Sequence, residues 1–147
     1  MPRGRVVTDV SSTVRQPGIS AARVKQIVEA TLAAERVKNA MISVALVGRA
    51  TISRLNREYL KHAGATDVIS FGMGRERRGA PAVGDIYICP DVARENARRN
   101  RVPLREELAR LVVHGTLHVL GHDHPDDETR TRSAMWKRQE KILASID

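Results

Sequence analysis

Apolar positions recur along most of this chain with the period of a helix or of a strand. Apolar residues spaced three or four apart predict five helices, at residues 20–37, 50–60, 91–100, 103–121 and 125–146. Short apolar or alternating runs predict buried strands at 41–47, 68–71 and 84–89, and a further edge strand within 6–14. This order of helices and strands indicates an α+β fold, in which a small mixed β-sheet is flanked by helices.

The predicted elements fit a single domain. A chain of 147 residues has the usual size of one domain. We expect residues 1–19 to form a partly flexible N-terminal segment and residues 20–147 to form the domain itself. In the last predicted helix, Met135, Trp136 and Ile142 are expected to pack in the core.

Cysteine content and apolar runs restrict the environment of the protein. Cys89 is the only cysteine, which excludes an internal disulfide and a cysteine-rich zinc site. The N-terminal residues lack the apolar segment of a secretory signal. No apolar run approaches the ~20 residues that a membrane-spanning helix needs. We therefore expect a cytoplasmic protein without a membrane partner.

The charge of the chain favours a polyanionic partner. Lys and Arg total 25 against 17 acids, a net charge of +8, and 20 of the 25 cations are Arg. The planar guanidinium binds phosphate with two parallel hydrogen bonds, so this composition suits nucleic acid. Phe, Trp and Tyr total only four residues, which makes a base-stacking sheet of the RRM kind a poor interpretation.

Four of the five histidines fall within eleven residues, from His114 to His124. His114 and His118 are four positions apart, so a helix places both imidazoles on one face, within reach of one metal ion. Gly121 can adopt the positive φ that ends a helix and turns the chain back, which would bring His124 to the same ion. Three neutral imidazoles and an open position are typical of a catalytic zinc site. We predict that His114, His118 and His124 bind one Zn²⁺, although imidazole also suits nickel, copper and iron.

A cluster of surface histidines without a metal is the simpler alternative. It fits poorly, because His114 and His118 interrupt the most apolar helix of the chain. Burying two imidazoles without partners would cost about 1–3 kcal/mol each, and a metal ion removes that cost.

The histidine spacing also matches the metzincin protease signature, H-x-x-x-H-x-x-G-x-x-H. In those proteases a Glu directly follows the first His and acts as the general base. Here Gly115 occupies that position and supplies no carboxylate. A metzincin-like metallohydrolase is therefore the less favoured alternative.

Together these motifs resemble the YbeY family of bacterial metal-dependent endoribonucleases. The resemblance rests on the histidine stretch at 114–124 and on Met135 and Glu140 in the last helix. Upstream it includes Leu55-Asn56-x-x-Tyr59, Thr66-Asp67-Val68-Ile69-Ser70-Phe71 and Gly84-Asp85-Ile86. These segments span roughly residues 40–140.

The resemblance implies an α+β fold and one zinc ion held by the three named histidines. It implies a single-strand-specific endoribonuclease that acts in 16S rRNA 3′ end maturation and in ribosome quality control. The implied partners are the 16S rRNA precursor and the small ribosomal subunit, with a possible contact to a ribosomal protein and none to DNA.

One position departs from the family pattern and leaves a second function open. The family pattern commonly places an Arg, implicated in RNA cleavage, directly after the Tyr, whereas this chain has Leu60 after Tyr59, and Leu60 cannot bind phosphate. Arg57 and Lys61 are the nearby cations that could reach the same space. The alternative is a ribosome-associated assembly factor that binds RNA with weak or no cleavage.

The sequence leaves the general acid and base open among Asp85, His122 and Asp123. His122 is out of phase with the first two histidines and is expected to face solvent or substrate. Asp123 is expected either to orient an imidazole or to serve only in the turn. For RNA binding, Arg99 and Arg101 in a basic stretch join Arg57 and Lys61 as candidates.

Overall fold

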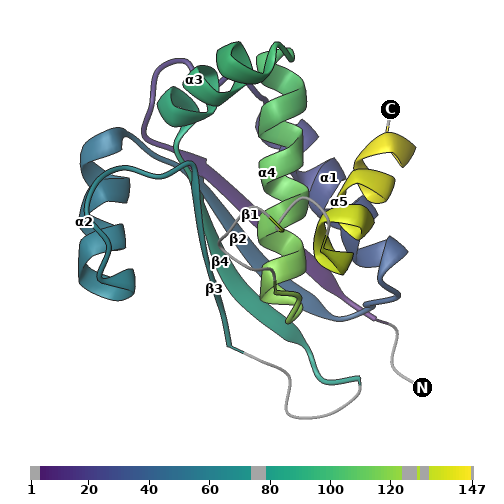
Figure 1. The fold of residues 1–147 in the computed structure, drawn as a ribbon. Coiled ribbons are helices and arrows are strands. Elements are labelled where there is room, and N and C mark those ends of the chain that lie inside the picture. The colour runs from purple at the N-terminus through teal and green to yellow at the C-terminus, as the bar shows by residue number, and fades with distance from the viewer. Residues whose placement is uncertain (1–3, 74–78, 124–128, 130–132, 147) are drawn as a thin grey trace.

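The computed structural model describes residues 4–73, 79–123, 129 and 133–146 (Figure 1). Over these residues the chain forms four strands and five helices. In chain order they are β1 (Val6–Ser12), α1 (Ala21–Ala34), β2 (Ala40–Leu46), α2 (Arg49–Leu60), β3 (Val68–Gly72), β4 (Ala82–Ile88), α3 (Pro90–Asn100), α4 (Leu104–Val119) and α5 (Ala134–Ser145). The predicted α+β class is confirmed.

The strands form one mixed sheet in the order β1-β2-β4-β3. β1 and β2 pair in parallel, as do β2 and β4, whereas β3 runs antiparallel to β4. The edge strand predicted within residues 6–14 is β1, which begins opposite Ala40 of β2. The segment before residue 20 thus contributes a strand to the sheet, and β3 forms the opposite edge.

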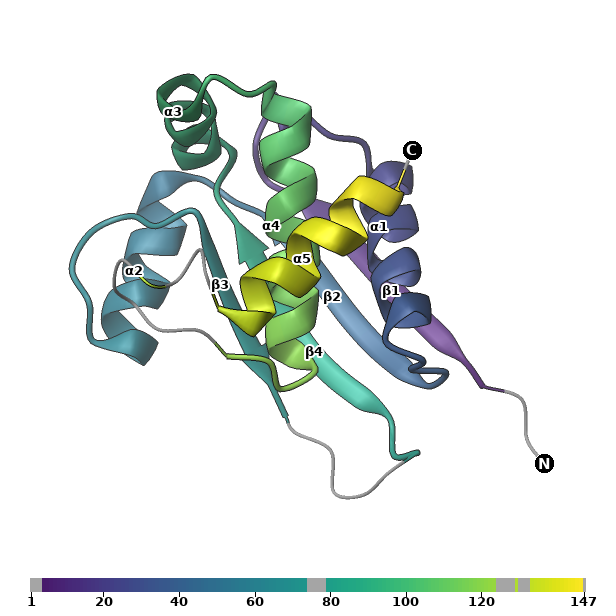
Figure 2. The same cartoon turned by 45° about the vertical axis from the view of Figure 1, so that its right-hand side comes forward.

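Helices cover the two faces of the sheet unequally. α1 and α4 pack on one face, and α5 crosses the outer side of α4 (Figure 2). The main core lies between this helix layer and the sheet, and it includes Val28, Ile42, Val44, Ile86 and Leu117. On the other face, α2 covers a smaller cluster that includes Ile52, Ile69 and Cys89. Within the described part of the chain, every helix is too short or too polar to cross a membrane.

Two glycines allow α4 to lie close to β4. A Cβ at Gly115 of α4 would come within 2.7 Å of Cγ2 of Ile86. A Cβ at Gly84 of β4 would come within 2.6 Å of both methyl carbons of Val119. Because strand side chains alternate between faces, Ile86 points toward α4 and its neighbours point away from it. This contact fixes which side chains of α4 remain outside the core.

The last helix begins later than its sequence pattern predicts. The acid-rich stretch at 125–128 suggested a start there, but the described helix α5 begins at Ala134. The Ser133 hydroxyl accepts a hydrogen bond from the backbone N–H of Trp136 at 3.1 Å, which caps the first turn. Met135 and Ile142 are buried as expected, whereas Trp136 is only half-buried, so its assignment to the core was wrong.

Candidate metal centre and adjoining cavity

The structure brings His114 and His118 together on α4. Their ring centroids lie 4.7 Å apart, with an angle of 71° between the ring planes. Both side chains are half-buried, although the residues around them on α4 are buried in the core. The helix spacing therefore positions two imidazoles at the edge of the core, as the sequence predicts.

The turn after α4 also follows the prediction. Gly121 has φ +100°, and its N–H donates to the His118 carbonyl at 2.9 Å. The His122 N–H donates to the Leu117 carbonyl at 3.0 Å. These two bonds close the helix in the usual way for a glycine after the C-terminus. His124, the predicted third ligand, lies outside the described residues, and those residues contain no group of three metal-ligating side chains.

Gln139 of α5 determines which nitrogen of His114 carries hydrogen. The Gln139 Nε2 donates to Glu140 Oε2 at 3.0 Å, so Gln139 Oε1 is the atom that faces the imidazole. His114 Nδ1 lies 2.6 Å from that oxygen and must be the donor. In the neutral ring Nε2 of His114 is then the unprotonated nitrogen, and the unprotonated nitrogen is the one that binds a metal.

A charged network supports Gln139 from the other side. Arg110 of α4 donates two hydrogen bonds to the Glu140 carboxylate, from Nε at 3.0 Å and from an Nη at 3.1 Å. Arg110 also donates to Glu107 at 3.1 Å and to Glu106 at 3.3 Å. Burial lowers the pKa of a guanidinium, but Glu140 and Glu107 outweigh it and raise the pKa of Arg110. For the Glu107 carboxyl, burial has the larger effect and raises the pKa, although the hydrogen bond and charge of Arg110 act to lower it.

These contacts fit a metal site at the histidine pair. The donors are two neighbouring imidazoles, one of which is oriented by a buried amide at its Nδ1. Imidazole nitrogen is a favoured ligand of zinc, and a second hydrogen bond on each ring is the usual support. His114 and His118 can therefore hold a zinc ion, with His124 as the predicted third ligand.

His122 is held by Glu35 at the end of α1. Its Nε2 lies 2.5 Å from Glu35 Oε1, and Arg138 Nε donates to Glu35 Oε2 at 2.7 Å. Burial raises the pKa of a carboxyl, but the hydrogen bonds of Arg138 and His122 outweigh it and lower the pKa of Glu35. The His122 side chain is 33% exposed and joins the turn to α1 and α5 through Glu35, and its predicted catalytic role stays a prediction.

The two predicted catalytic carboxylates lie in different places. Asp85 of β4 precedes Ile86, so it projects from the sheet face opposite α4, where it accepts a hydrogen bond from Ser43 Oγ at 2.5 Å. The structure therefore does not bring Asp85 to the histidine pair. Asp123 is exposed in the turn that follows Gly121. Its predicted catalytic role stays a prediction.

The predicted RNA-binding cations lie on two helices. Arg57 and Lys61 are exposed at the C-terminal end of α2, which packs on the face of the sheet opposite α4. Arg99 and Arg101 are exposed at the end of α3. Arg99 lines the cavity next to His114, whereas Arg101 lines a separate hollow with Arg98 and Leu104.

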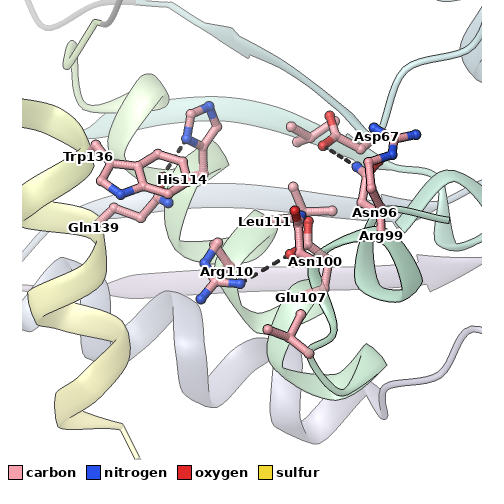
Figure 3. A pocket seen from close by; sticks show the side chains of 12 residues that line it. Asp67, Asn96, Arg99, Asn100, Glu107, Arg110, Leu111, His114, Trp136 and Gln139 are labelled. Atoms are coloured by element: carbon pink, nitrogen blue, oxygen red, sulfur yellow. Dashed lines mark hydrogen bonds and ion pairs between the residues drawn. The ribbon is translucent and has the colours of Figure 1, made fainter. Parts of the chain in front are cut away.

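A cavity of about 470 Å³ adjoins His114 (Figure 3). Its walls come from the segment before β3 and from α3, α4 and α5. Trp136, His114 and Gln139 lie at one end of the cavity, and Asp67, Asn96 and Arg99 lie at the other. The histidine pair is therefore next to a space that is large enough for part of a substrate.

Comparison with known proteins identifies the family. The family model described as Endoribonuclease YbeY matches residues 9–147. The chain belongs to the YbeY family. This confirms the resemblance predicted from the histidine stretch and the upstream motifs.

YbeY proteins from several bacteria are similar to this chain over most of its length. The Endoribonuclease YbeY of Bacillus licheniformis is 34% identical in an alignment that covers 94% of this chain and 93% of that protein. That of Renibacterium salmoninarum is 40% identical over 112 residues, 71% of this chain and 70% of that protein. A solution structure from Thermotoga maritima matches with a TM-score of 0.67 at 26% identity, over 95% of this chain and 89% of the other.

Leu60 is the position at which this chain departs from the YbeY pattern, which commonly has an Arg after the Tyr. It is the last residue of α2 and is 41% exposed. The preceding residue, Tyr59, packs edge-on against Phe71 of β3, with ring centroids 5.4 Å apart. The end of α2 is thereby fixed beside the edge strand, and a longer side chain at position 60 would extend into solvent.

Sequence reasoning missed the residues that support His114 in this YbeY protein. Gln139 is 1% exposed and lies between Met135 and Ile142 on the buried face of α5. A polar residue inside an apolar stripe was the available signal, because a buried amide needs hydrogen-bond partners. Its partner, His114, is 25 residues away in the chain, so no local pattern identified the pair.

Proposed function

We propose that this protein is a zinc-dependent endoribonuclease that cleaves single-stranded RNA. The observation that carries the proposal is the pair of imidazoles on α4, with Nδ1 of His114 committed to Gln139. Relatives of this chain are named Endoribonuclease YbeY, which supports RNA as the substrate. The proposed reaction is hydrolysis of a phosphodiester bond.

His114, His118 and His124 would hold the zinc ion. When bound, zinc polarises a phosphoryl oxygen and lowers the pKa of a coordinated water to about 7. Gln139 keeps the hydrogen of His114 on Nδ1 and so keeps Nε2 available as a ligand. Arg99, on the wall of the adjoining cavity, is positioned to bind a backbone phosphate of the RNA.

The net charge of +8 supports a polyanionic substrate. Phosphate contacts release condensed counterions, so binding of single-stranded RNA is expected to weaken steeply as salt is raised. The resemblance to the YbeY family further favours the 3′ end of the 16S rRNA precursor as the target. Ribosome quality control, contact with the small subunit and a cytoplasmic location belong to the same proposal.

Replacement of His114 tests the proposal. We expect His114→Ala to lose bound zinc and to lose cleavage of a fragment of the 16S rRNA 3′ end. His62→Ala is the matched control, because His62 is exposed after α2 and lies outside the site. Metal content is measured by elemental analysis and cleavage by gel electrophoresis. Cleavage at the wild-type rate by metal-free His114→Ala protein would contradict the proposal.

An RNA-binding assembly factor with weak or no cleavage is the second candidate. Leu60 favours it, because an apolar side chain at this position cannot stabilise charge on a phosphate. Single-turnover cleavage separates the two candidates, since both bind RNA and only the first converts it. A metzincin-like protease is disfavoured, because the close contact of Gly115 with Ile86 leaves no room for the catalytic Glu.

A further inference from the structure

We propose that the cavity beside His114 is a nucleobase subsite, which accepts one unstacked base of the RNA next to the cleaved bond. The inference rests on the proposed nuclease function and adds to it the part of the substrate that the protein recognises. It is carried by the size of the cavity, by the charges on its walls and by the side chains that line it.

The size and position of the cavity suit one unit of a single strand. A volume of about 470 Å³ lies within the range of small-ligand pockets. The cavity is lined by His114 itself, so a group bound there is next to the proposed metal ion. A base in a duplex is stacked and paired, so only an unpaired base could enter.

The charges on the walls disfavour a phosphate in the interior. Asp67 and Glu107 contribute carboxylates to the lining. Arg110 contributes a guanidinium, but this cation is already shared between Glu140 and Glu107. Among the described lining residues Arg99 is the cation left for a phosphate, and it lies at the end of the cavity opposite His114, whereas a neutral heteroaromatic ring at the His114 end needs no cation. The interior therefore suits a base better than the RNA backbone.

Arg99 provides the charge for the RNA backbone at the end of the cavity opposite His114. It is exposed, and within the part of the chain that the structure describes it forms no ion pair. Its neighbour Arg98 faces a different hollow and donates to the Arg94 carbonyl at 3.5 Å. One helix thus presents two similar cations, of which only Arg99 reaches the proposed subsite.

The lining also supplies the groups that recognise a base. Trp136 is half-buried and lies at the His114 end of the cavity (Figure 3). Unstacked bases commonly stack on aromatic rings, while amide side chains bond their edges. Asn96 and Asn100 contribute amides, and Asn96 Nδ2 donates to Asp67 Oδ2 at 3.1 Å, which orients the Asn96 amide.

Fluorescence of Trp136 tests the subsite directly, because Trp136 is the only tryptophan of the chain. The zinc-loaded protein is titrated with AMP and, separately, with ribose 5-phosphate, with excitation at the red edge where nucleotides do not absorb. We expect saturable quenching by AMP and none by ribose 5-phosphate. Equal effects of the two compounds would overturn the proposal, because the base would then contribute nothing.

Cleavage of oligoribonucleotides that lack one base tests the role of the subsite in the reaction. We expect one position next to the cut at which removal of the base lowers kcat/KM by about 5- to 150-fold, the value of one stacked base. Trp136→Ala should lower kcat/KM on intact RNA by a similar factor and abolish the effect of removing that base. Trp136→Phe, which retains a ring, should recover part of the loss and shows that the site remains folded.

The cations of α3 provide a matched pair of variants. Arg99→Ala should raise KM for RNA, whereas Arg98→Ala should leave it unchanged. If the wild-type protein cleaves RNA but no single base matters and Trp136→Ala cleaves normally, the subsite is refuted and the nuclease function stands. If the base of AMP quenches Trp136 but the protein neither binds nor cleaves RNA, the nuclease function fails, and the RNA subsite fails with it.

Discussion

Nδ1 of His114 and Oε1 of Gln139 lie 2.6 Å apart, across the contact between α4 and α5. Gln139 is in turn fixed by Glu140, and Glu140 is held by two hydrogen bonds from Arg110 on α4. The proposed metal ligand is therefore oriented by a closed set of contacts between two helices. The amide side chain has one acceptor and uses it on the imidazole, which leaves a single tautomer of His114.

Loss of the Gln139 acceptor should weaken metal binding. Gln139→Leu keeps the approximate volume but leaves Nδ1 of His114 without its partner. We expect zinc affinity to fall by about 10- to 100-fold, as is usual when a group that orients a ligand is removed. Competition with a chelator measures the affinity, and nitrogen NMR reports the tautomer of His114.

Gln139→Glu is the matching control, because it retains an oxygen at the same place. We expect it to bind zinc more tightly than Gln139→Leu. Wild-type affinity in Gln139→Leu, with an unchanged His114 tautomer, would contradict the orienting role of this contact.

An arginine at position 60 should increase cleavage. Leu60 is 41% exposed at the end of α2, so a longer side chain fits without disturbing the core. We expect Leu60→Arg to raise the single-turnover rate about 10-fold or more, because the family pattern commonly has an Arg implicated in cleavage here and a donor at a reacting group contributes about 10²- to 10³-fold. Leu60→Lys should gain less, because it lacks the planar fork of Arg. No cleavage by either the wild-type protein or the Leu60→Arg variant would favour the assembly factor.

A methyl group at position 115 should destabilise the protein. Ala gains about 1 kcal/mol over Gly in a helix, but its Cβ would lie 2.7 Å from Cγ2 of Ile86. Overpacking of this kind costs about 1–3 kcal/mol, so we expect a net loss of up to about 2 kcal/mol in the free energy of unfolding. Chemical denaturation measures it.

Gly115→Ala in an Ile86→Ala background distinguishes steric overlap with Ile86 from other causes of the lost stability. There Gly115→Ala should cost less than in the wild-type protein, because the overlapping side chain is gone. Gly48→Ala is the spatial control, since no atom lies within 4 Å of its Cβ position. An equal cost of Gly115→Ala in both backgrounds would mean that the close contact with Ile86 is not the reason for the glycine.

Acid should remove the stabilisation provided by Glu35. Hydrogen bonds from Arg138 and His122 outweigh burial and lower the pKa of Glu35 below its ordinary value of 4.5. A lowered pKa in the folded state stabilises the protein above that ordinary value, and the stabilisation is lost as the pH falls through the folded pKa. We expect Glu35→Gln to be less stable than the wild-type protein near neutral pH, with a difference that shrinks below pH 4.5.

Denaturation curves at several pH values measure this difference. Glu58→Gln is the control, because the Glu58 carboxylate forms no ion pair within the residues that the structure describes. A constant difference between Glu35→Gln and the wild-type protein across the acid range would show that Glu35 stabilises the fold without its charge.

Local patterns were sufficient for most of the secondary structure. Periods of two and of about 3.6 residues identify strands and helices, because each element buries one face. The same reasoning placed His114 and His118 on one face of α4 and gave Gly121 its positive φ. These features depend on residues within a few positions of one another, so the sequence alone determines them.

Other features depend on contacts between distant segments, and only the tertiary structure decided them. Asp85 projects away from the histidines because its neighbour Ile86 packs on Gly115 of α4. His122 turns to Glu35 because the end of α1 lies beside the turn after α4. Trp136 lines a cavity, and Gln139 reaches His114, because α5 crosses α4 at that point. Periodicity shows which face of an element is buried, but not which element covers it, and the chemistry of this site depends on that choice.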